Sequence, residues 1–189
     1  MGYLQNAGTF LITSLFGAFI CLFLVRTMLI AIGASFYEPV CRFVYMVTNP
    51  VISPIRAFVP RWRRIELASV LVAWLLCLVE LGLLVAIFGL RVGVSGLILR
   101  ALVDVLDWTI LIQLVAILAW CVLSFFPAVR YDDTFNLLGR FVDPVIRPFR
   151  RLVPALGGLD LSPWVASIAL ILARMLVVAP LNDLAMRLG

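Results

Sequence analysis

Residues 49–60 read Asn49-Pro50-Val51-Ile52-Ser53-Pro54-Ile55-Arg56-Ala57-Phe58-Val59-Pro60, and residues 143–154 read Asp143-Pro144-Val145-Ile146-Arg147-Pro148-Phe149-Arg150-Arg151-Leu152-Val153-Pro154. The two stretches align without a gap at a separation of 94 residues, and all three prolines coincide. Three coinciding prolines are much less expected by chance than a shared apolar run, so the chain is predicted to contain an internal duplication. We divide it into two repeats, residues 1–94 and 95–189.

The rest of the sequence has the composition of a membrane protein. Of its 189 residues, 65% are hydrophobic and 13% are charged, and the mean hydropathy is +1.17, far from the composition of soluble domains. Crossing a hydrocarbon core takes about 20 apolar residues. Four windows are long enough, and they lie near Phe10–Ser35, Leu67–Leu90, Trp108–Phe126 and Ser162–Pro180. The predicted fold is an all-α integral membrane protein with four transmembrane helices, arranged as two parallel two-span repeats. The first window is expected to be retained, because no basic residue precedes it as in a cleavable signal peptide.

The charged residues exclude much ordinary chemistry. The net charge of +5 comes from arginine alone, since the chain has no lysine and no histidine. Histidine is the usual acid–base group at neutral pH, and lysine supplies Schiff bases. The four cysteines lack C-x-x-C spacing and are interpreted as small packing residues; they are Cys21, Cys41, Cys77 and Cys121. We expect no enzyme activity, no cofactor and no metal.

The distribution of arginine predicts the orientation of the chain in the membrane. Ten arginines lie between the first and second or the third and fourth spans: Arg42, Arg56, Arg61, Arg63, Arg64, Arg130, Arg140, Arg147, Arg150 and Arg151. The central connection has two and the C-terminal tail one. Because basic loops remain in the cytoplasm, both proline segments are expected there, with both termini outside a bacterial inner membrane. The repeats then enter the membrane in the same direction, unlike inverted transporter repeats.

Short amphipathic stretches precede both proline segments. Val40–Val47 and Phe135–Val142 have apolar residues three and four apart with an arginine on the other side, which predicts helices lying parallel to the bilayer surface. Asp133 or Thr134 is expected to cap the second of these helices. Asp143-Pro144 predicts its end, because the residue before proline avoids the helical region.

Two other segments carry local signals. Asp160, Ser162 and Pro163 form a helix-start signature for the fourth span. In the central connection, Arg100, Asp104 and Asp107 recur at spacings of four and three. They predict either an amphipathic helix on the outer surface that leads into the third span, or a solvated linker.

Residues 143–163 closely resemble the signature of the YggT (YlmG) membrane protein family, and residues 49–69 resemble it in weaker form. The first copy has Arg63-Arg64 where the second has Gly157-Gly158, and Ser69 where the second has Pro163. Two tandem units are similar to the bacterial form of the family. The resemblance implies a protein without an established enzymatic role. It also implies a link to osmotic or cation stress, to a division-associated gene neighbourhood, or, as in chloroplast relatives, to cofactor attachment and membrane organisation.

The two proline segments are the candidate contact sites for anionic phospholipid or a protein partner, because guanidinium groups bind phosphate through two hydrogen bonds. Basic inner loops are also what the positive-inside rule alone requires, and this alternative stays open. The candidate residues are Pro50, Pro54, Arg56, Pro60, Arg61, Arg63, Arg64, Asp143, Pro144, Arg147, Pro148, Arg150, Arg151, Pro154, Asp160, Ser162 and Pro163.

Three charged residues are expected inside the bilayer, where charge is costly and often functional. These are Arg26, Glu80 and Arg174, and the last two occupy equivalent positions in the repeats. Counting from the nearest acidic residue outside each span places them about 18 to 21 Å deep. We expect Glu80 to lie within hydrogen-bonding reach of Arg174 or Arg26. The cluster is either a polar site on an ion pathway or a buried pair that fixes helix register.

Two functions follow from these features. The first is a non-enzymatic inner-membrane scaffold or assembly factor that contacts anionic lipid or an unknown cytosolic protein. The second is a small channel or transporter for ion or osmotic balance. Its pore would lie between subunits of a homo-oligomer, because four spans make a thin bundle. No nucleic-acid partner is expected.

Overall fold

The computed structural model describes residues 3–35, 37–56, 66–89, 92–126, 132–151 and 160–188. These residues form seven α-helices and one π-helix in the described part of the chain. They are α1 (Tyr3–Ala31), α2 (Pro39–Arg56), α3 (Leu67–Phe88), α4 (Val94–Ser124), α5 (Asp133–Arg150), α6 (Ser162–Ala173), the π-helix η2 (Arg174–Val178) and α7 (Ala179–Arg187).

Four helical segments are long and apolar enough to cross a membrane, with α6, η2 and α7 forming one continuous segment. The prediction of an all-helical, multi-pass membrane fold is therefore confirmed. The helix bounds differ from the prediction at several places. α1 covers Tyr3–Ala31 instead of Phe10–Ser35. α4 begins at Val94 instead of near Trp108, and the fourth segment continues past Pro180 to Arg187.

Of the two alternatives for the central connection, a helix that leads into the third span agrees with the structure and a linker does not. This helix is continuous with the span and is not a separate surface helix. Arg100, Asp104 and Asp107 lie inside α4. Arg100 and Asp104 form an ion pair of 3.4 Å along one helical turn, and the leucines around them favour continuous helix. The polar residues therefore belong to the spanning segment itself.

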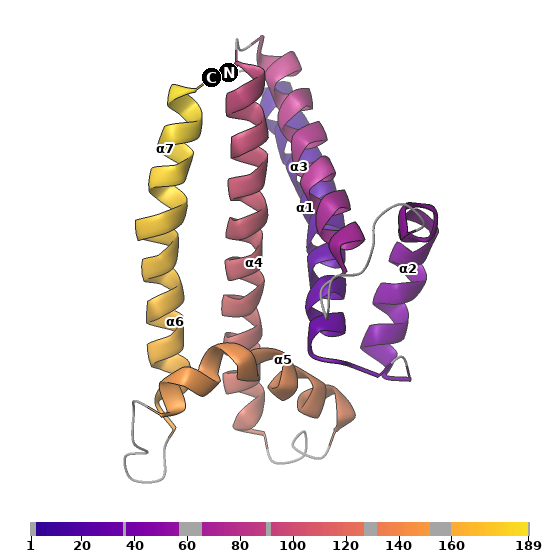
Figure 1. Cartoon of the computed structure of the whole chain (residues 1–189), viewed down its shortest axis with the longest axis vertical. Helices are drawn as coiled ribbons and strands as arrows, with labels where there is room; N and C mark the ends of the chain where they lie inside the picture. The colour runs from indigo at the N-terminus through magenta and orange to yellow at the C-terminus, as the bar shows by residue number, and fades with distance from the viewer. Residues whose placement is uncertain are drawn as a thin grey trace.

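The long helices form a bundle in which α4 lies between the α1–α3 pair and the segment containing α6 and α7 (Figure 1). α1 packs chiefly on α3. The start of α1, the end of α3, the start of α4 and the end of α7 lie at one end, called here the terminal end (Figure 1). α5 crosses α4 near its C-terminal end, at the opposite end of the bundle, called here the α5 end (Figure 1).

The duplication extends to helix boundaries. α5 begins and ends 94 residues after α2, and both helices have 18 residues. The helix end predicted at Asp143-Pro144 is wrong, because α5 continues through both of its prolines, as α2 does through its own. Pro50, Pro54, Pro144 and Pro148 all lie on exposed faces, so the carbonyl groups that proline leaves without a donor need not be buried. The cap of α5 is Asp132, which accepts the Thr134 backbone N–H at 2.8 Å.

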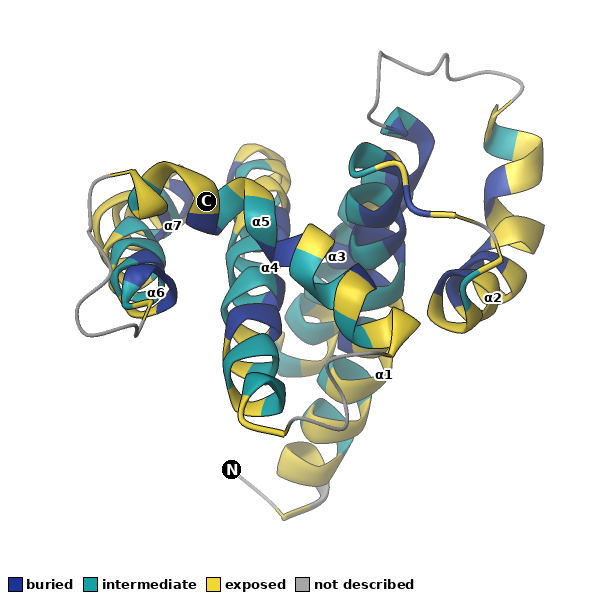
Figure 2. Cartoon of the chain, turned by 90° about the horizontal axis from the view of Figure 1, so that it is seen from below, coloured by how far each residue is buried: buried dark blue, intermediate teal, exposed yellow. Residues whose placement is uncertain are grey.

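The orientations of the two short helices differ. α5 lies across the bundle, as expected for a surface helix, whereas α2 runs alongside the lower part of α1 (Figure 1). Seen from below, the buried residues lie where α1, α3 and α4 face one another, and exposed residues lie on the outside (Figure 2). The exposed residues of the long helices include many leucines, valines and isoleucines, as expected where a helix faces lipid.

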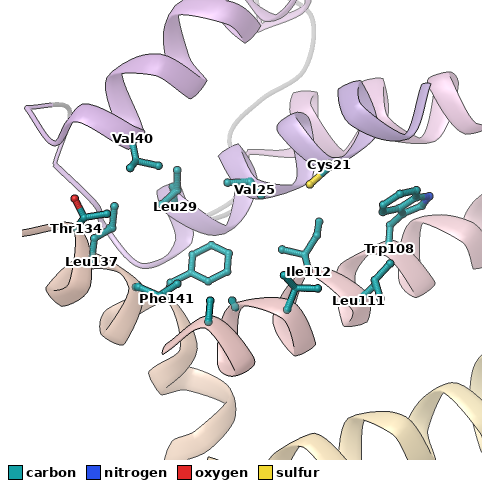
Figure 3. Close-up of a pocket in the computed structure, with 14 residues that line it drawn as sticks. Cys21, Val25, Leu29, Val40, Trp108, Leu111, Ile112, Thr134, Leu137 and Phe141 are labelled. Carbon is teal, nitrogen blue, oxygen red and sulfur yellow. The ribbon is translucent and has the colours of Figure 1, made fainter. Parts of the chain in front are cut away.

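An apolar hollow of about 410 Å³ lies between α1 of the first repeat and α4 and α5 of the second (Figure 3). Cys21, Val25 and Leu29 of α1 line one side, and side chains of α4 and α5 line the other. Its lining includes the ring of Trp108, and this ring lies 2.9 Å from the place where a Cβ on Gly17 would be. A glycine at this position therefore lets α1 and α4 approach each other.

The π-helix lies in the fourth spanning segment, just before a proline. The Ala179 N–H donates to the Arg174 carbonyl, five residues back. Pro180 follows, and it lacks an N–H and crowds the preceding turn. Widening of the helix by one residue accommodates the proline without breaking the segment.

Candidate functional site

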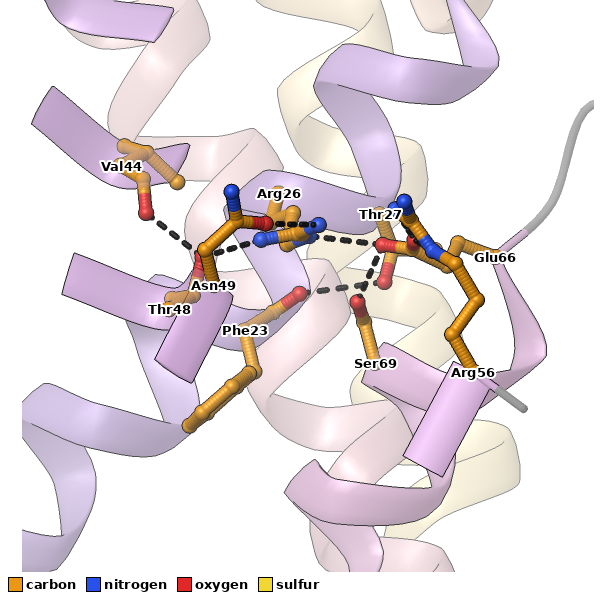
Figure 4. Close-up of polar contacts among 9 residues, drawn as sticks. All are labelled: Phe23, Arg26, Thr27, Val44, Thr48, Asn49, Arg56, Glu66 and Ser69. Atoms are coloured by element: carbon orange, nitrogen blue, oxygen red, sulfur yellow. Dashed lines mark hydrogen bonds and ion pairs between the residues drawn. The ribbon is translucent and has the colours of Figure 1, made fainter. Parts of the chain in front are cut away.

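A buried arginine organises the polar residues of the first repeat at the α5 end (Figure 4). Arg26 of α1 is 1% exposed. Its Nε donates to Glu66 Oε2 at 2.7 Å and its Nη1 to Thr48 Oγ1 at 2.7 Å. Its Nη2 donates to Asn49 Oδ1 at 3.1 Å. The Tyr45 ring covers the guanidinium at 4.9 Å from its centroid, and each of the three guanidinium nitrogens donates to an acceptor although the group is buried.

Glu66 collects the hydrogen bonds of this cluster. It immediately precedes α3 and is 3% exposed. Besides the bond from Arg26, its carboxylate accepts a hydrogen bond from Ser69 Oγ at 2.7 Å. It also accepts hydrogen bonds from Nε of Arg56 at 3.1 Å and from Nη2 of Arg56. Burial alone would raise its pKa, but the hydrogen bonds from Arg26, Ser69 and Arg56 outweigh burial and lower the pKa from 4.5 to about 2. The carboxylate is therefore ionised and joins α1, α2 and α3. We call Arg26, Thr48, Asn49, Arg56, Glu66 and Ser69 the Glu66 cluster.

The second repeat has a related but different arrangement. Arg150 and Asp160 stand at the positions of Arg56 and Glu66 and pair at 3.2 Å. Trp120 replaces Arg26, and the Arg150 guanidinium lies 5.7 Å from the centroid of its ring. Arg150 also pairs with Asp143 at 3.1 Å. Burial alone would raise the pKa of Asp160, but hydrogen bonds from Ser162 and Arg150 together outweigh it and lower the pKa. An arginine joined to an acid ten residues later is thus common to both copies, whereas the buried arginine belongs to the first alone.

The predicted cluster of Arg26, Glu80 and Arg174 does not form. Arg26 pairs with Glu66, and Arg174 pairs with Asp107 at 2.6 Å and 2.8 Å. In the described part of the chain, Glu80 forms an ion pair with neither arginine. α1 ends at Ala31, which places Arg26 only about 8 Å from that end. α4 also lies between α3 and α6 (Figure 1), so the equivalent positions 80 and 174 do not meet.

A second polar group lies deeper in the bundle. Asp107 and Arg174 are each about 20 Å from the terminal end, counting 1.5 Å per helical residue. They line a hollow of about 350 Å³ together with Asn182 of α7. Nearer that end, Arg100 pairs with Asp104, whose carboxylate lies close enough to Glu80 for the two charges to repel. We call Glu80, Arg100, Asp104, Asp107 and Arg174 the membrane polar row.

The structure divides the described arginines of the two intra-repeat connections into two groups. Arg56 and Arg150 are held by acids of their own repeat, and Arg140 is held by Glu38. Arg42, Arg147 and Arg151 are exposed and have no acidic partner within the described ranges. Pro60, Arg61, Arg63, Arg64 and Pro154 lie outside the described residues. Asp160, Ser162 and Pro163 stand at the start of α6, where Asp160 accepts the Ser162 N–H at 2.9 Å.

Sequence reasoning missed several members of the Glu66 cluster. Glu66 served only as the point from which the depth of Glu80 was counted, and Thr48, Asn49 and Ser69 were given no role. One available signal was the helical spacing of Tyr45, Thr48 and Ile52, which places Thr48 on the buried face of α2. A buried polar residue needs a hydrogen-bond partner. Arg26 is a charged residue of the same repeat, so a contact between Arg26 and Thr48 could have been proposed.

The described residues contain no grouping of histidine, cysteine, aspartate or glutamate that could hold a metal ion. The four cysteines are free and dispersed. Burial, with Glu38 nearby, raises the pKa of the Cys41 thiol to about 11, so this cysteine is protonated and unreactive at neutral pH.

The fold and these paired charges define a multi-pass helical membrane protein built from a tandem two-span repeat. The CCB3/YggT family model matches residues 5–87 and again residues 99–181. The chain therefore belongs to the CCB3/YggT family.

The relatives have no stated activity. An "uncharacterized protein in proC 3′ region" of Vibrio alginolyticus is 36% identical over 183 residues, which cover 92% of this chain and 94% of that one. An uncharacterised protein of Pseudomonas aeruginosa is 32% identical, with 98% and 94% covered. The uncharacterised protein YggT of Escherichia coli K12 is 32% identical, with 90% and 89% covered. No solved structure gives a significant match.

The depressed pKa of Glu66 predicts loss of stability in acid. Because the folded pKa is below the unfolded one, Glu66 stabilises the protein fully above about pH 4.5, by about 3 kcal/mol. This contribution is lost as the pH falls toward about 2. Melting temperatures of the wild type and Glu66→Gln should therefore differ at pH 7 and converge in acid. A constant difference between the two proteins from neutral pH down to about 2.5 would contradict this role for Glu66.

Proposed function

We propose that this protein is a non-enzymatic scaffold or assembly factor of the bacterial inner membrane, with both termini outside. Its α2 and α5 segments contact anionic phospholipid or a cytosolic protein partner. The arginine distribution supports this orientation. The uncharacterised relatives give no indication of catalysis, which is compatible with such a role.

The observation that carries the proposal is the face of α5 formed by its unpaired arginines. Arg147 and Arg151 are four residues apart, so they lie on one side of the helix, and both are exposed. Arg150 between them is already bound to Asp143 and Asp160. The acids of the repeat thus satisfy one arginine and leave two available for an external anion. The helix that carries them is fixed to the bundle by buried Leu137, Phe141, Val142 and Ile146.

Replacing both Arg147 and Arg151 with Gln is expected to weaken association with anionic lipid or partner by about 2 kcal/mol, at about 1 kcal/mol for each arginine near the surface. The measurement is affinity purification of the full chain from native membranes, with quantification of bound lipid and co-purified proteins. Arg187→Gln is the matched control, because it removes one exposed arginine at the terminal end. An unchanged lipid and protein profile in the double variant would leave these arginines as topology signals alone.

The membrane polar row favours a second candidate, an ion-conducting role in a homo-oligomer. Three carboxylates and two guanidiniums lie between the terminal end and mid-membrane, and intramembrane charges often mark ion paths. The test is cation flux into liposomes containing the purified chain, with Asp104→Asn expected to alter it. A pore would be favoured over a scaffold if flux is present in the wild type and lost in this variant.

A further inference from the structure

The orientation of Asn49 leaves a hydrogen-bond donor facing away from the Glu66 cluster. A guanidinium has no acceptor, so the Asn49 oxygen faces Arg26, and their distance is 3.1 Å. The amide nitrogen consequently points away from Arg26 (Figure 4). Asn49 is exposed, so this nitrogen is available to an external acceptor.

Two further donors share this face of α2. Ser53 and Arg56 follow Asn49 at four and seven residues, which places all three on one side of the helix. Arg56 gives Nε and Nη2 to Glu66 and keeps Nη1 available. Asn49, Ser53 and Arg56 line a hollow of about 500 Å³, together with Met46 and Pro50.

The charge behind these donors favours an anion. Arg26 and Arg56 share the single carboxylate of Glu66, so the cluster has a net charge of +1. Arg26 is buried and cannot be hydrated, and charges are screened less in such surroundings. The carbonyl groups at the end of α2 oppose an anion, but Arg56 lies in the last turn and offsets them.

The equivalent positions of the second repeat lack two features of this arrangement. Asp143 replaces Asn49 and presents a carboxylate where the first repeat has an amide donor. Arg150, at the position of Arg56, is held by two carboxylates, those of Asp143 and Asp160. Arg147 remains an exposed arginine assigned to the α5 contact. Trp120 replaces the buried cation. The two repeats should therefore differ in anion binding although their backbones correspond.

We propose that the Asn49, Ser53 and Arg56 face of α2 binds the phosphate group of an anionic phospholipid. A lipid is favoured over soluble phosphate because the neighbouring face of α2 is apolar and exposed, at Val40, Phe43, Val47 and Val51. Acyl chains can cover this face while the phosphate occupies the hollow. The inference rests on the proposed function in one respect, that α2 lies at the inner headgroup layer.

The test is photo-crosslinking of the full chain in nanodiscs with a phosphatidylglycerol analogue that carries the reactive group on its acyl chain. Trypsin releases Phe43–Arg56 from α2 and Phe141–Arg150 from α5 as separate peptides, so labelling can be assigned to each repeat. We expect preferential labelling of Phe43–Arg56. A phosphatidylcholine analogue should label it about five- to tenfold less, as one missing charge contact implies.

Asn49→Asp should reduce labelling of Phe43–Arg56 by about the same factor, because it removes the donor and the net positive charge. The variant keeps an acceptor for Arg26, so the cluster should fold, and a melting curve checks this. Asn136→Asp is the control, since it adds the same charge at an exposed position of α5. Unchanged labelling in Asn49→Asp, or equal losses in both variants, would overturn the site. Ser53→Ala, which leaves charge and the Arg26 contact intact, should give a smaller loss.

Two further results separate this proposal from its alternatives. If excess inorganic phosphate abolishes labelling of the α2 peptide, the site takes a soluble phosphate and the lipid assignment is wrong. If Arg147→Gln with Arg151→Gln loses partner or lipid while Asn49→Asp loses nothing, the scaffold proposal stands and the α2 site fails. The converse result supports the α2 site and removes the contact proposed for α5.

Discussion

Replacing Glu66 with Gln is expected to destabilise the protein by about 3–5 kcal/mol, because it leaves a buried Arg26 without a counter-charge. Arg26 and Glu66 are 1% and 3% exposed and their atoms are 2.7 Å apart. The amide oxygen of the new side chain could still accept one hydrogen bond, but the amide would not neutralise the guanidinium. The measurement is thermal unfolding of the purified chain in detergent at neutral pH.

The second repeat provides the matched control. Asp160→Asn removes the equivalent carboxylate, but Asp160 and Arg150 are 44% and 40% exposed, so its loss should cost no more than about 1 kcal/mol. Combining Glu66→Gln with Arg26→Met should recover much of the lost stability, since both buried charges are then gone. Equal effects of the Glu66 and Asp160 variants would show that burial does not distinguish the two repeats.

Asp107→Asn should also have a large effect, about 2.5–3.5 kcal/mol, the range of insertion costs for a charge near the centre of a spanning helix. The variant leaves Arg174 unpaired about 20 Å from the terminal end of the bundle. Some of the cost will be relieved because the Arg174 side chain is 38% exposed in the single chain and can reorient toward water. The measurement is again the melting temperature in detergent, with yield in membranes as a second readout.

Glu80→Gln distinguishes this pairing from the one expected from repeat symmetry. It should leave stability nearly unchanged or raise it, because Glu80 and Asp104 repel each other. Asp107→Asn combined with Arg174→Met should be more stable than Asp107→Asn alone. If instead Glu80→Gln proves the more damaging change, Arg174 pairs with Glu80 in the membrane and the contact with Asp107 is incorrect.

The features predicted correctly from the sequence are those that depend on local composition. Hydropathy gives the four spans because the lipid environment demands long apolar helices. The coincidence of three prolines gives the duplication, and α2 and α5 reproduce it in their bounds. Asp160, Ser162 and Pro163 stand at the start of α6 because capping and proline placement are local effects.

The charge pairs could not be predicted because they depend on where each helix ends and which helices meet. The depth of Arg26 was counted from Glu38, but α1 ends at Ala31 and a turn follows. The symmetry of positions 80 and 174 suggested contact, but α4 separates the helices that carry them. Equivalent positions in a duplication share a local environment only when their neighbours are equivalent too.

The prolines of α2 and α5 were misread for a different reason. Proline in a helix interior usually breaks it, because it removes one hydrogen bond and crowds the preceding turn. Here Pro50, Pro54, Pro144 and Pro148 lie on exposed faces, while the opposite face is anchored by buried side chains such as Ile52 and Ile146. Tertiary packing outweighs the local preference, and the sequence alone does not show that packing.

The second repeat has Trp120 at the position of Arg26, and this difference affects how the contacts between helices respond to salt. In the first repeat, the buried carboxylate of Glu66 holds α2 and α3 together. Salt screens this carboxylate poorly because water does not reach it. In the second repeat, half-exposed ion pairs of Arg150 with Asp143 and Asp160, and the ring of Trp120 beside Arg150, hold α5 and α6 together. Dissolved salt weakens such exposed ion pairs. Raising the salt concentration should therefore weaken the contact between α5 and α6 more than the contact between α2 and α3.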